Sequence, residues 1–163
     1  SAEGSIPIVF DSSSCAYSIK NCRNDLNEKM KEIYDRLTLL DSIEFFHKIR
    51  GRLSIKNKKK SVVLHPNCSV VKMGLIETMI ETAKICSDDV IVPENLGCCG
   101  FAGDRGLLFP ELTASALKEE MQEVNSLNYD AYYSSNIPCN IGLNTLSAKK
   151  YLHIVHLLKE CID

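Results

Sequence analysis

Four short β-rich runs alternate with stretches of helical periodicity, and this alternation is the strongest constraint on the fold. The runs are rich in β-branched or aromatic residues and are bounded by polar or turn residues: Ile6–Phe10, Ser61–His65, Asp89–Val92 and Ala131–Ser134. Because they lack strict apolar–polar alternation, we expect strands that are buried on both faces. Strands that alternate with helices predict an α/β fold with an open, mainly parallel four-stranded sheet and helices on both faces.

The expected helices are marked by apolar residues at helical spacing. Three stripes carry this signal: Leu26, Met30, Ile33 and Leu37; Val71, Leu75, Met79 and Ala83; and Leu112, Leu117, Met121 and Val124. Pro110 is well placed near the start of the third helix. A last helix is expected from about Leu152 to Glu160.

Length and charge limit the classes of function. The 163 residues predict a single domain over 1–163, and a net charge of −2 indicates neither an acidic nor a basic partner. Residues 48–60 hold seven basic side chains and no acidic one, but no RNA-binding or helix-turn-helix signature accompanies them. We therefore expect a solvated loop and no nucleic-acid partner. The apolar runs are too short for a transmembrane segment, and no signal peptide is recognisable.

We accordingly expect a cytoplasmic location, with peripheral association at the inner face of the membrane as the alternative. In a reducing compartment, eight cysteines indicate buried fillers, metal ligands or redox groups rather than disulfides. Five of them follow the predicted strands: Cys15, Cys68, Cys98, Cys99 and Cys139. The loops at the carboxyl ends of parallel strands gather at one edge of a sheet, so these thiols are expected to converge. We interpret Cys22, Cys86 and Cys161 as ordinary thiols.

Metal binding is the leading interpretation of the converging thiols. Thiolates suit iron–sulfur clusters and zinc, and the adjacent Cys98 and Cys99 form a strained pair for a disulfide but a natural pair for a metal. Redox thiol chemistry and inert packing are the alternatives. The C-x-x-C spacing that is usual for a zinc finger is absent.

A glycine-rich loop surrounds the cysteine pair. Residues 97–106 read GCCGFAGDRG and match neither common phosphate-binding template. We expect the loop to bend around a bulky cluster and to direct amide groups at its sulfurs, with Arg105 adding positive charge. A salt bridge between Asp104 and Arg105 is the alternative for these two residues. The loop positions expected to support the cofactor are Gly97, Gly100, Gly103, Asp104 and Arg105.

His65 lies three residues before Cys68, where it would serve as a ligand, a proton relay or a donor to a ligand. The simpler alternative is a histidine that is only hydrogen-bonded. His153 and His156 have no acidic partner in a metal-binding pattern, so we do not expect them to be ligands. No catalytic triad, zinc-protease motif or nucleophile elbow is recognisable, and no catalytic residue is assigned.

Four blocks of the sequence, taken in order, resemble a known family. They are DSSSC at Asp11–Cys15, HPNCS at His65–Ser69, GCCGFAGDRGLLFPELTASA at Gly97–Ala116 and YYSSNIPCNIGL at Tyr132–Leu143. They resemble the cysteine-rich CCG domain of heterodisulfide reductase, of the iron–sulfur subunit of glycolate oxidase and of lactate-utilisation proteins. The closer resemblance is to the C-terminal region of FAD-linked D-lactate dehydrogenases.

The resemblance implies an iron–sulfur cluster, expected to be 4Fe–4S, with zinc as the alternative. Cys68, Cys98, Cys99 and Cys139 match the family's ligands, and Cys15 resembles an additional early cysteine. The family's last C-x-x-C is incomplete here because residue 142 is glycine. This departure puts a cluster that uses more cysteines in doubt.

The resemblance also implies an electron-transfer domain excised from a larger flavoenzyme. FAD and ferredoxin-like domains are then expected in the missing part, and quinone or another acceptor would receive the electrons of D-lactate or a similar 2-hydroxy acid. A structural zinc module and a disulfide-reductase-like subunit are the alternative functions.

Overall fold

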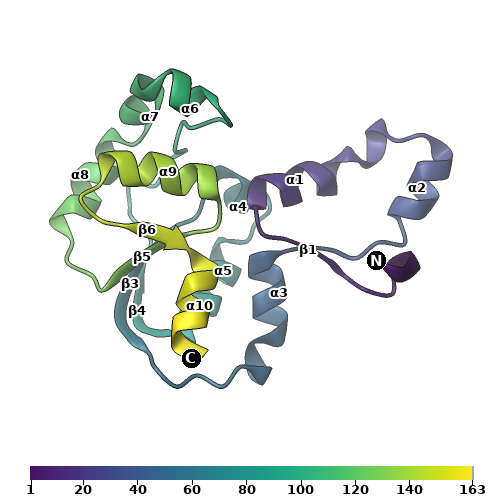
Figure 1. The fold of residues 1–163 in the computed structure, drawn as a ribbon, viewed down its shortest axis with the longest axis horizontal. Helices are drawn as coiled ribbons and strands as arrows, with labels where there is room; N and C mark the ends of the chain where they lie inside the picture. The colour runs from purple at the N-terminus through teal and green to yellow at the C-terminus, as the bar shows by residue number, and fades with distance from the viewer. Residues whose placement is uncertain (163) are drawn as a thin grey trace.

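The computed structural model describes residues 1–162 and contains a four-stranded, all-parallel sheet. The strands lie in the order β4 (Ser87–Ile91), β3 (Lys59–His65), β5 (Ala131–Ser134) and β6 (Tyr151–His153). Each neighbouring pair is parallel, and the register of β3 with β5 runs from Val62–Ala131 to His65–Ser134. The expected α/β fold with a parallel four-stranded sheet is confirmed (Figure 1).

The sheet is not built from the four predicted strands. The first of them, β1 (Ile8–Phe10), pairs instead with β2 (Leu39–Asp41) in a separate two-stranded parallel sheet. The place of the fourth strand is taken by β6, within residues for which the periodicity predicted a helix from about Leu152. The helix itself, α10 (Ile154–Ile162), begins two residues later. Leu152 packs against the same core cluster as α10. Its apolar side chain therefore continues the pattern of the helix, although Leu152 lies in the strand.

Helices cover both faces of the sheet, as expected. Val62 and Leu64 of β3 join a buried cluster with α3 (Ser42–Ile49), α5 (Ile76–Lys84) and α10. Val63, between them, faces a second cluster with α8 (Lys118–Ser126) and α9 (Ile137–Leu146). Since successive side chains of a strand point to opposite faces, this alternation places one core on each side of the sheet.

Two of the predicted helices are interrupted. Gly74, with φ at +68°, separates α4 (Cys68–Lys72) from α5, and Leu117 separates α7 (Pro110–Ala116) from α8. The short α6 (Arg105–Leu108) precedes α7. Three single 3₁₀ turns complete the described elements: Ala2–Gly4, Cys22–Asp25 and Arg50–Arg52. None of the helices in residues 1–162 is long and apolar enough to span a membrane.

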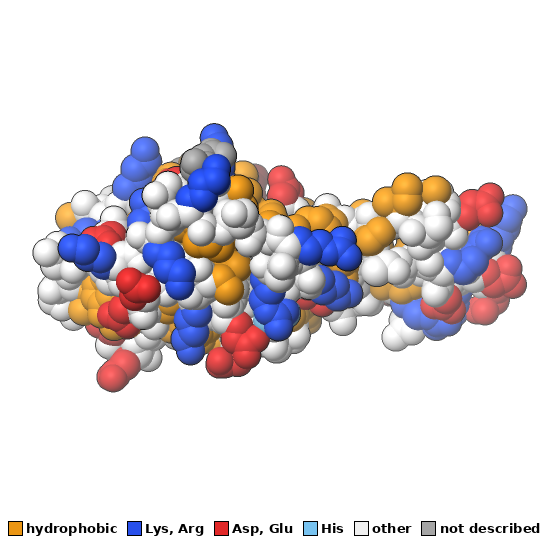
Figure 2. All heavy atoms as spheres, turned by 90° about the horizontal axis from the view of Figure 1, so that it is seen from below, with side chains coloured by type: hydrophobic (Ala, Val, Ile, Leu, Met, Phe, Trp, Pro, Cys, Tyr) orange, Lys and Arg blue, Asp and Glu red, His pale blue; other side chains and the backbone are white. Residues whose placement is uncertain are grey.

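Residues 1–38 form an arm that extends from the body of the molecule (Figure 1). It carries β1, α1 (Ser13–Asn21) and α2 (Glu28–Tyr34). Only Ser13 and Ala16 are buried in it, and the predicted apolar stripe of α2 leaves Met30 and Ile33 exposed. Figure 2 shows apolar side chains along the surface of this arm. The apolar side chains of α2 therefore recur at helical spacing, but they do not pack against a buried core.

The core of the sheet generates a stability prediction. Met79 of α5 is fully buried, whereas Val71 of α4, in the same predicted stripe, is 46% exposed. We expect Met79→Ala to lower the free energy of unfolding by about 2–5 kcal/mol, because it removes buried methylene groups and leaves a cavity. Val71→Ala should change the free energy by about 0.5 kcal/mol or less. Urea unfolding followed by circular dichroism compares the two, and equal losses would contradict this assignment of the core.

Candidate metal centre

Four of the predicted thiols meet at the carboxyl edge of the sheet. Cys68 begins α4 directly after β3, Cys98 and Cys99 lie in the loop after β4, and Cys139 lies in the first turn of α9 after β5. All four line one cavity of about 240 Å³, and the other lining residues are Ser14, Ser69, Phe101, Ala102, Gly103, Asn136 and Pro138. Segments that are more than 70 residues apart in the chain therefore share one site.

Cys15 is placed differently from the other four. It lies on α1 and is exposed, and it is not among the residues that line the cavity. Because β1 is outside the four-stranded sheet, the expectation drawn from the edge of that sheet does not extend to Cys15. The neighbouring Ser14 does line the cavity, so α1 reaches the site through its serine side chains.

The arm is tied to the site by hydroxyl groups. Ser12 Oγ donates to Asn136 Oδ1 at 2.6 Å, and Ser14 Oγ donates to the same atom at 3.2 Å. Ser13 Oγ donates to Ser135 Oγ at 2.9 Å, and that atom also accepts a hydrogen bond from Asn67 Nδ2 at 2.7 Å. These contacts hold the first turn of α1 against the loop after β5.

The remaining cysteines lie away from the cavity. Cys86 and Cys161 are buried in the core on the α5 and α10 side of the sheet, where the Cys161 thiol donates to the carbonyl oxygen of Cys86 at 3.5 Å. Cys22 is half-buried, and its thiol donates to the carbonyl oxygen of Ile19 at 3.2 Å. Their placement agrees with the interpretation of these residues as ordinary thiols.

Two of the cavity thiols are in direct contact. Cys99 Sγ and Cys139 Sγ are 2.8 Å apart, and both side chains are buried. The hydrogen bond from Cys139 lowers the pKa of the Cys99 thiol to about 6 despite its burial, and the backbone N–H of Phe101 and the charge of His65 act in the same direction. The same hydrogen bond raises the pKa of Cys139, because that thiol must keep its proton to donate it. The contact therefore favours a single negative charge on the pair, carried by Cys99.

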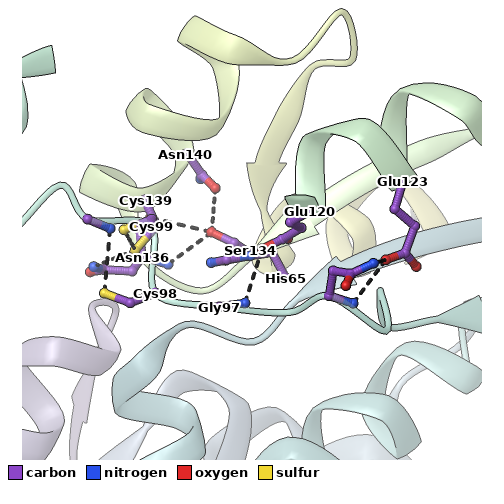
Figure 3. A network of polar contacts seen from close by, with 12 residues as sticks. His65, Gly97, Cys98, Cys99, Glu120, Glu123, Ser134, Asn136, Cys139 and Asn140 are labelled. Atoms are coloured by element: carbon purple, nitrogen blue, oxygen red, sulfur yellow. Dashed lines mark hydrogen bonds and ion pairs between the residues drawn. The ribbon is translucent and has the colours of Figure 1, made fainter. Parts of the chain in front are cut away.

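Polar hydrogens surround the sulfurs (Figure 3). The Gly100 N–H donates to Cys98 Sγ at 3.5 Å, and Asn136 Nδ2 donates to Cys139 Sγ at 3.4 Å. Burial raises the pKa of Cys98, the Gly100 N–H opposes this, and the neighbouring Cys68 thiol adds to the rise. Sequence reasoning missed Asn136, although it stands in the SSNIPC block at the residue that precedes α9.

His65 lies at the end of β3 and is fully buried. Its Nδ1 is 2.6 Å from Oε1 of Glu120, which is buried on α8, while its Nε2 is buried and has no hydrogen-bond partner. The N–H of Gly97 donates to Oε2 of Glu120 at 3.4 Å. Sequence reasoning missed Glu120 because an acidic residue beside Met121 on a helix with a polar face suggests a solvated side chain.

The two charged residues of the loop lie outside the cavity. Asp104 and Arg105 are exposed at the start of α6, and neither is among the residues that line the cavity. Arg105 instead lines a separate hollow with Phe109, Glu111 and Leu112. A direct role of the Arg105 charge at the cysteines stays a prediction.

The donor set fits a thiolate-held metal group. Four soft sulfur ligands line the cavity, and thiolates are the ligands of iron–sulfur clusters and of many zinc sites. Within residues 1–162, however, no three His, Cys, Asp or Glu side chains are arranged to hold one metal ion.

Comparisons with known proteins agree with this site. Residues 62–144, slightly more than half of the chain, match the family model of a cysteine-rich domain named CCG. Lactate utilization protein A of Oceanobacillus iheyensis is 27% identical over 105 residues. The aligned region covers 61% of this chain and 43% of that protein, so the chain spans less than half of the length of this relative.

The cysteine loop predicts that one glycine is required and another is replaceable. Both Gly100 and Gly103 have positive φ, but a Cβ on Gly100 would lie 2.8 Å from Ala116 Cβ and 3.0 Å from Leu112 O, whereas a Cβ on Gly103 meets nothing within 4 Å. We expect Gly100→Ala to cost about 1–3 kcal/mol more than Gly103→Ala, because it overpacks the loop. It should also lower bound metal, while Gly103→Ala retains most of it. Urea unfolding and metal analysis measure both, and equal effects would contradict the close packing of Gly100.

The contact between Cys99 and Cys139 predicts a specific oxidation product in metal-free protein. Two thiols lose two electrons and two protons to dioxygen, which becomes hydrogen peroxide, as the disulfide forms. Because the attacking species is the thiolate, formation should be faster at pH 8 than at pH 5, below the pKa of about 6 for Cys99. Peptide mapping by mass spectrometry should find Cys99 joined to Cys139. A Cys68–Cys98 disulfide as the main product would contradict the prediction.

Proposed function

Because this chain belongs to the family of cysteine-rich CCG domains, we propose that it holds an iron–sulfur cluster and transfers electrons. The observation that carries the proposal is the convergence of Cys68, Cys98, Cys99 and Cys139 on one cavity. Three loops that are distant in the sequence supply these thiols. Thiols that serve only as small apolar fillers are buried, whereas Cys68 and Cys98 are exposed at the mouth of the cavity.

The sequence blocks around the cysteines are the ground for a cluster rather than a single zinc ion. Tetrahedral zinc requires four ligand atoms about 2.0–2.3 Å from one point, whereas an iron–sulfur cluster distributes its thiolates over several iron atoms. In the metal-free chain Cys99 contacts Cys139, and Cys98 lies beside Cys68. We expect a 4Fe–4S cluster, with zinc as the alternative that metal analysis separates.

The residues of the chain have distinct roles in this proposal. The pKa of Cys99 is lowered, whereas Cys98 and Cys139, whose pKa values are raised, must release protons when a metal binds. The donors from Gly100 and Asn136 remain next to the sulfurs, where such hydrogen bonds tune a reduction potential. When bound, the cluster supplies reversible one-electron transfer. Cys68 and Cys98 are exposed, so this side of the centre would face an electron-transfer partner.

The finer proposal is an electron-transfer domain of an FAD-linked D-lactate, or D-2-hydroxy acid, dehydrogenase. It is supported by the name of the relative, which concerns lactate utilisation, and by the sequence blocks around the cysteines. FAD and ferredoxin-like domains would belong to another part of the protein or complex, and quinone or another acceptor would receive the electrons. In the same proposal Cys15 approaches the site through α1, which serine hydroxyls hold against Asn136.

Disulfide reduction is a second candidate, favoured by one observation. The contacting pair of Cys99 and Cys139, with one thiol of lowered pKa, is the arrangement that thiol–disulfide exchange requires. Turnover of a disulfide substrate by the metal-free chain, with a thiol reductant that returns Cys99 and Cys139 to the dithiol, would support this candidate. Turnover only after iron loading would favour the cluster.

Single-cysteine variants test the proposed site. We expect Cys99→Ser to lose most of the bound iron after anaerobic reconstitution, because it removes a ligand at the centre of the cavity. The matched controls are Cys86→Ser and Cys161→Ser, which change buried thiols elsewhere and should keep iron at the wild-type ratio. Iron, zinc and acid-labile sulfide per chain are measured for each variant.

The outcomes separate the candidates. Loss of iron from the Cys86→Ser control, with the protein still folded, would contradict the placement of the centre. Stoichiometric zinc in colourless protein that cannot be reconstituted with iron would contradict the iron–sulfur proposal and favour the zinc module.

A further inference from the structure

His65 and Glu120 form a buried pair directly behind the cysteine cavity. His65 is the last residue of β3, and its Nδ1 lies 2.6 Å from Oε1 of Glu120 on α8. The side chains are 0% and 1% exposed. Within the described residues, the ion pairs of Glu120 include no partner other than His65. Burying an acid and a base together is costly unless close geometry and further hydrogen bonds offset the loss of hydration.

The charge balance of the pair fixes where its protons lie. A carboxylate that accepts from the Nδ1–H of a neutral histidine would leave a net negative charge buried beside cysteine thiolates. The groups that face the pair do not offset such a charge: Tyr151 of β6 is neutral and buried, Glu123 is acidic, and the Gly97 N–H is a weak donor at 3.4 Å. Because Oε2 of Glu120 accepts from the Gly97 N–H, one proton of an electrically neutral pair lies between Nδ1 and Oε1, and the other lies on Nε2 of His65.

This Nε2 has no acceptor within the chain. It is buried, and it has no hydrogen-bond partner among the described residues. Figure 3 places His65 between Glu120 on one side and the group formed by Cys99, Asn136 and Cys139 on the other. The charge of His65 also acts on the Cys99 thiol. A buried donor that is left unpaired is rare, because it loses its hydrogen bonds to water without replacement.

We infer that Nε2–H of His65 donates a hydrogen bond to a sulfur of the metal centre, and that Glu120 is the positioning residue that orients the ring. The inference rests on the proposed function. A donor next to the sulfurs stabilises the reduced centre, whose negative charge is larger, and so raises its reduction potential. The pair contributes a fixed donor at the buried side of the cavity, opposite the exposed Cys68 and Cys98.

Three variants test this role through the reduction potential of the reconstituted centre. His65→Met removes the donor with little change of volume. His65→Gln places an amide N–H at the same distance along the side chain, so it should restore much of the wild-type potential. Glu120→Gln keeps a hydrogen bond to Nδ1 without the charge, and should fall between wild type and His65→Met.

The expected shift is negative. For His65→Met, the ratio of reduced to oxidised centre at a fixed applied potential should fall about tenfold, which corresponds to about 59 mV for a one-electron couple. Iron content and circular dichroism of each variant confirm that equal amounts of loaded, folded protein are compared. A wild-type potential in fully loaded His65→Met, or a His65→Gln potential no higher than that of His65→Met, would overturn the inference.

A spectroscopic measurement on wild-type protein decides the case if His65→Met fails to fold or to load. Pulsed EPR of the reduced protein labelled with ¹⁵N-histidine should show a weak nitrogen coupling to the centre, because His65 lies next to the cysteines (Figure 3). No coupling would overturn the hydrogen bond, and a coupling of metal-bound strength would replace it with direct ligation. Protein without any iron or EPR signal would instead contradict the proposed function.

Discussion

Parallel pairing of β3 with β5 determines where the cysteines meet. The register runs to His65 and Ser134 at the carboxyl ends of both strands, so the loops that follow them leave the sheet side by side. Cys68 lies three residues beyond one strand end and Cys139 five residues beyond the other. The loop after β4, on the other side of β3, brings Cys98 and Cys99 to the same edge. A shift of this register would separate the thiols, and the cavity would lose its donor set.

At this edge of the sheet, the chain stabilises negative charge on sulfur that burial alone would disfavour. Thiolates on the buried side of the cavity need hydrogen-bond donors or a counter-charge. The loop amide of Gly100, the side-chain amide of Asn136 and the thiol of Cys139 supply donors, and His65 supplies a buried basic side chain that acts on Cys99. Two of them are held by a second contact: Asn136 by the serines of α1, and His65 by Glu120 of α8. The arm and α8 therefore position groups at the site, although neither carries a cavity-lining cysteine.

The sequence predicted the parts of the fold that local patterns determine. β-rich runs at 61–65, 89–92 and 131–134 coincide closely with β3, β4 and β5, and from them follows the convergence of four cysteines. The pairing partners of the edge strands depend on contacts that no local window contains. β1 and β6 have only three residues each, so their pairing was not predictable, and the expected position of Cys15 depended on the pairing of β1. The role of Cys15 as a ligand stays a prediction. Glu120 was unpredictable for a similar reason, because its burial depends on His65, 55 residues away.

We propose that four thiols from three loops hold one iron–sulfur cluster. The most direct test is Mössbauer spectroscopy of anaerobically reconstituted wild-type protein, together with its iron and sulfide content. The account predicts about four irons and four sulfides per chain in a single type of cluster with sulfur ligands. One tightly bound zinc per chain, with iron only adventitiously associated, would contradict it.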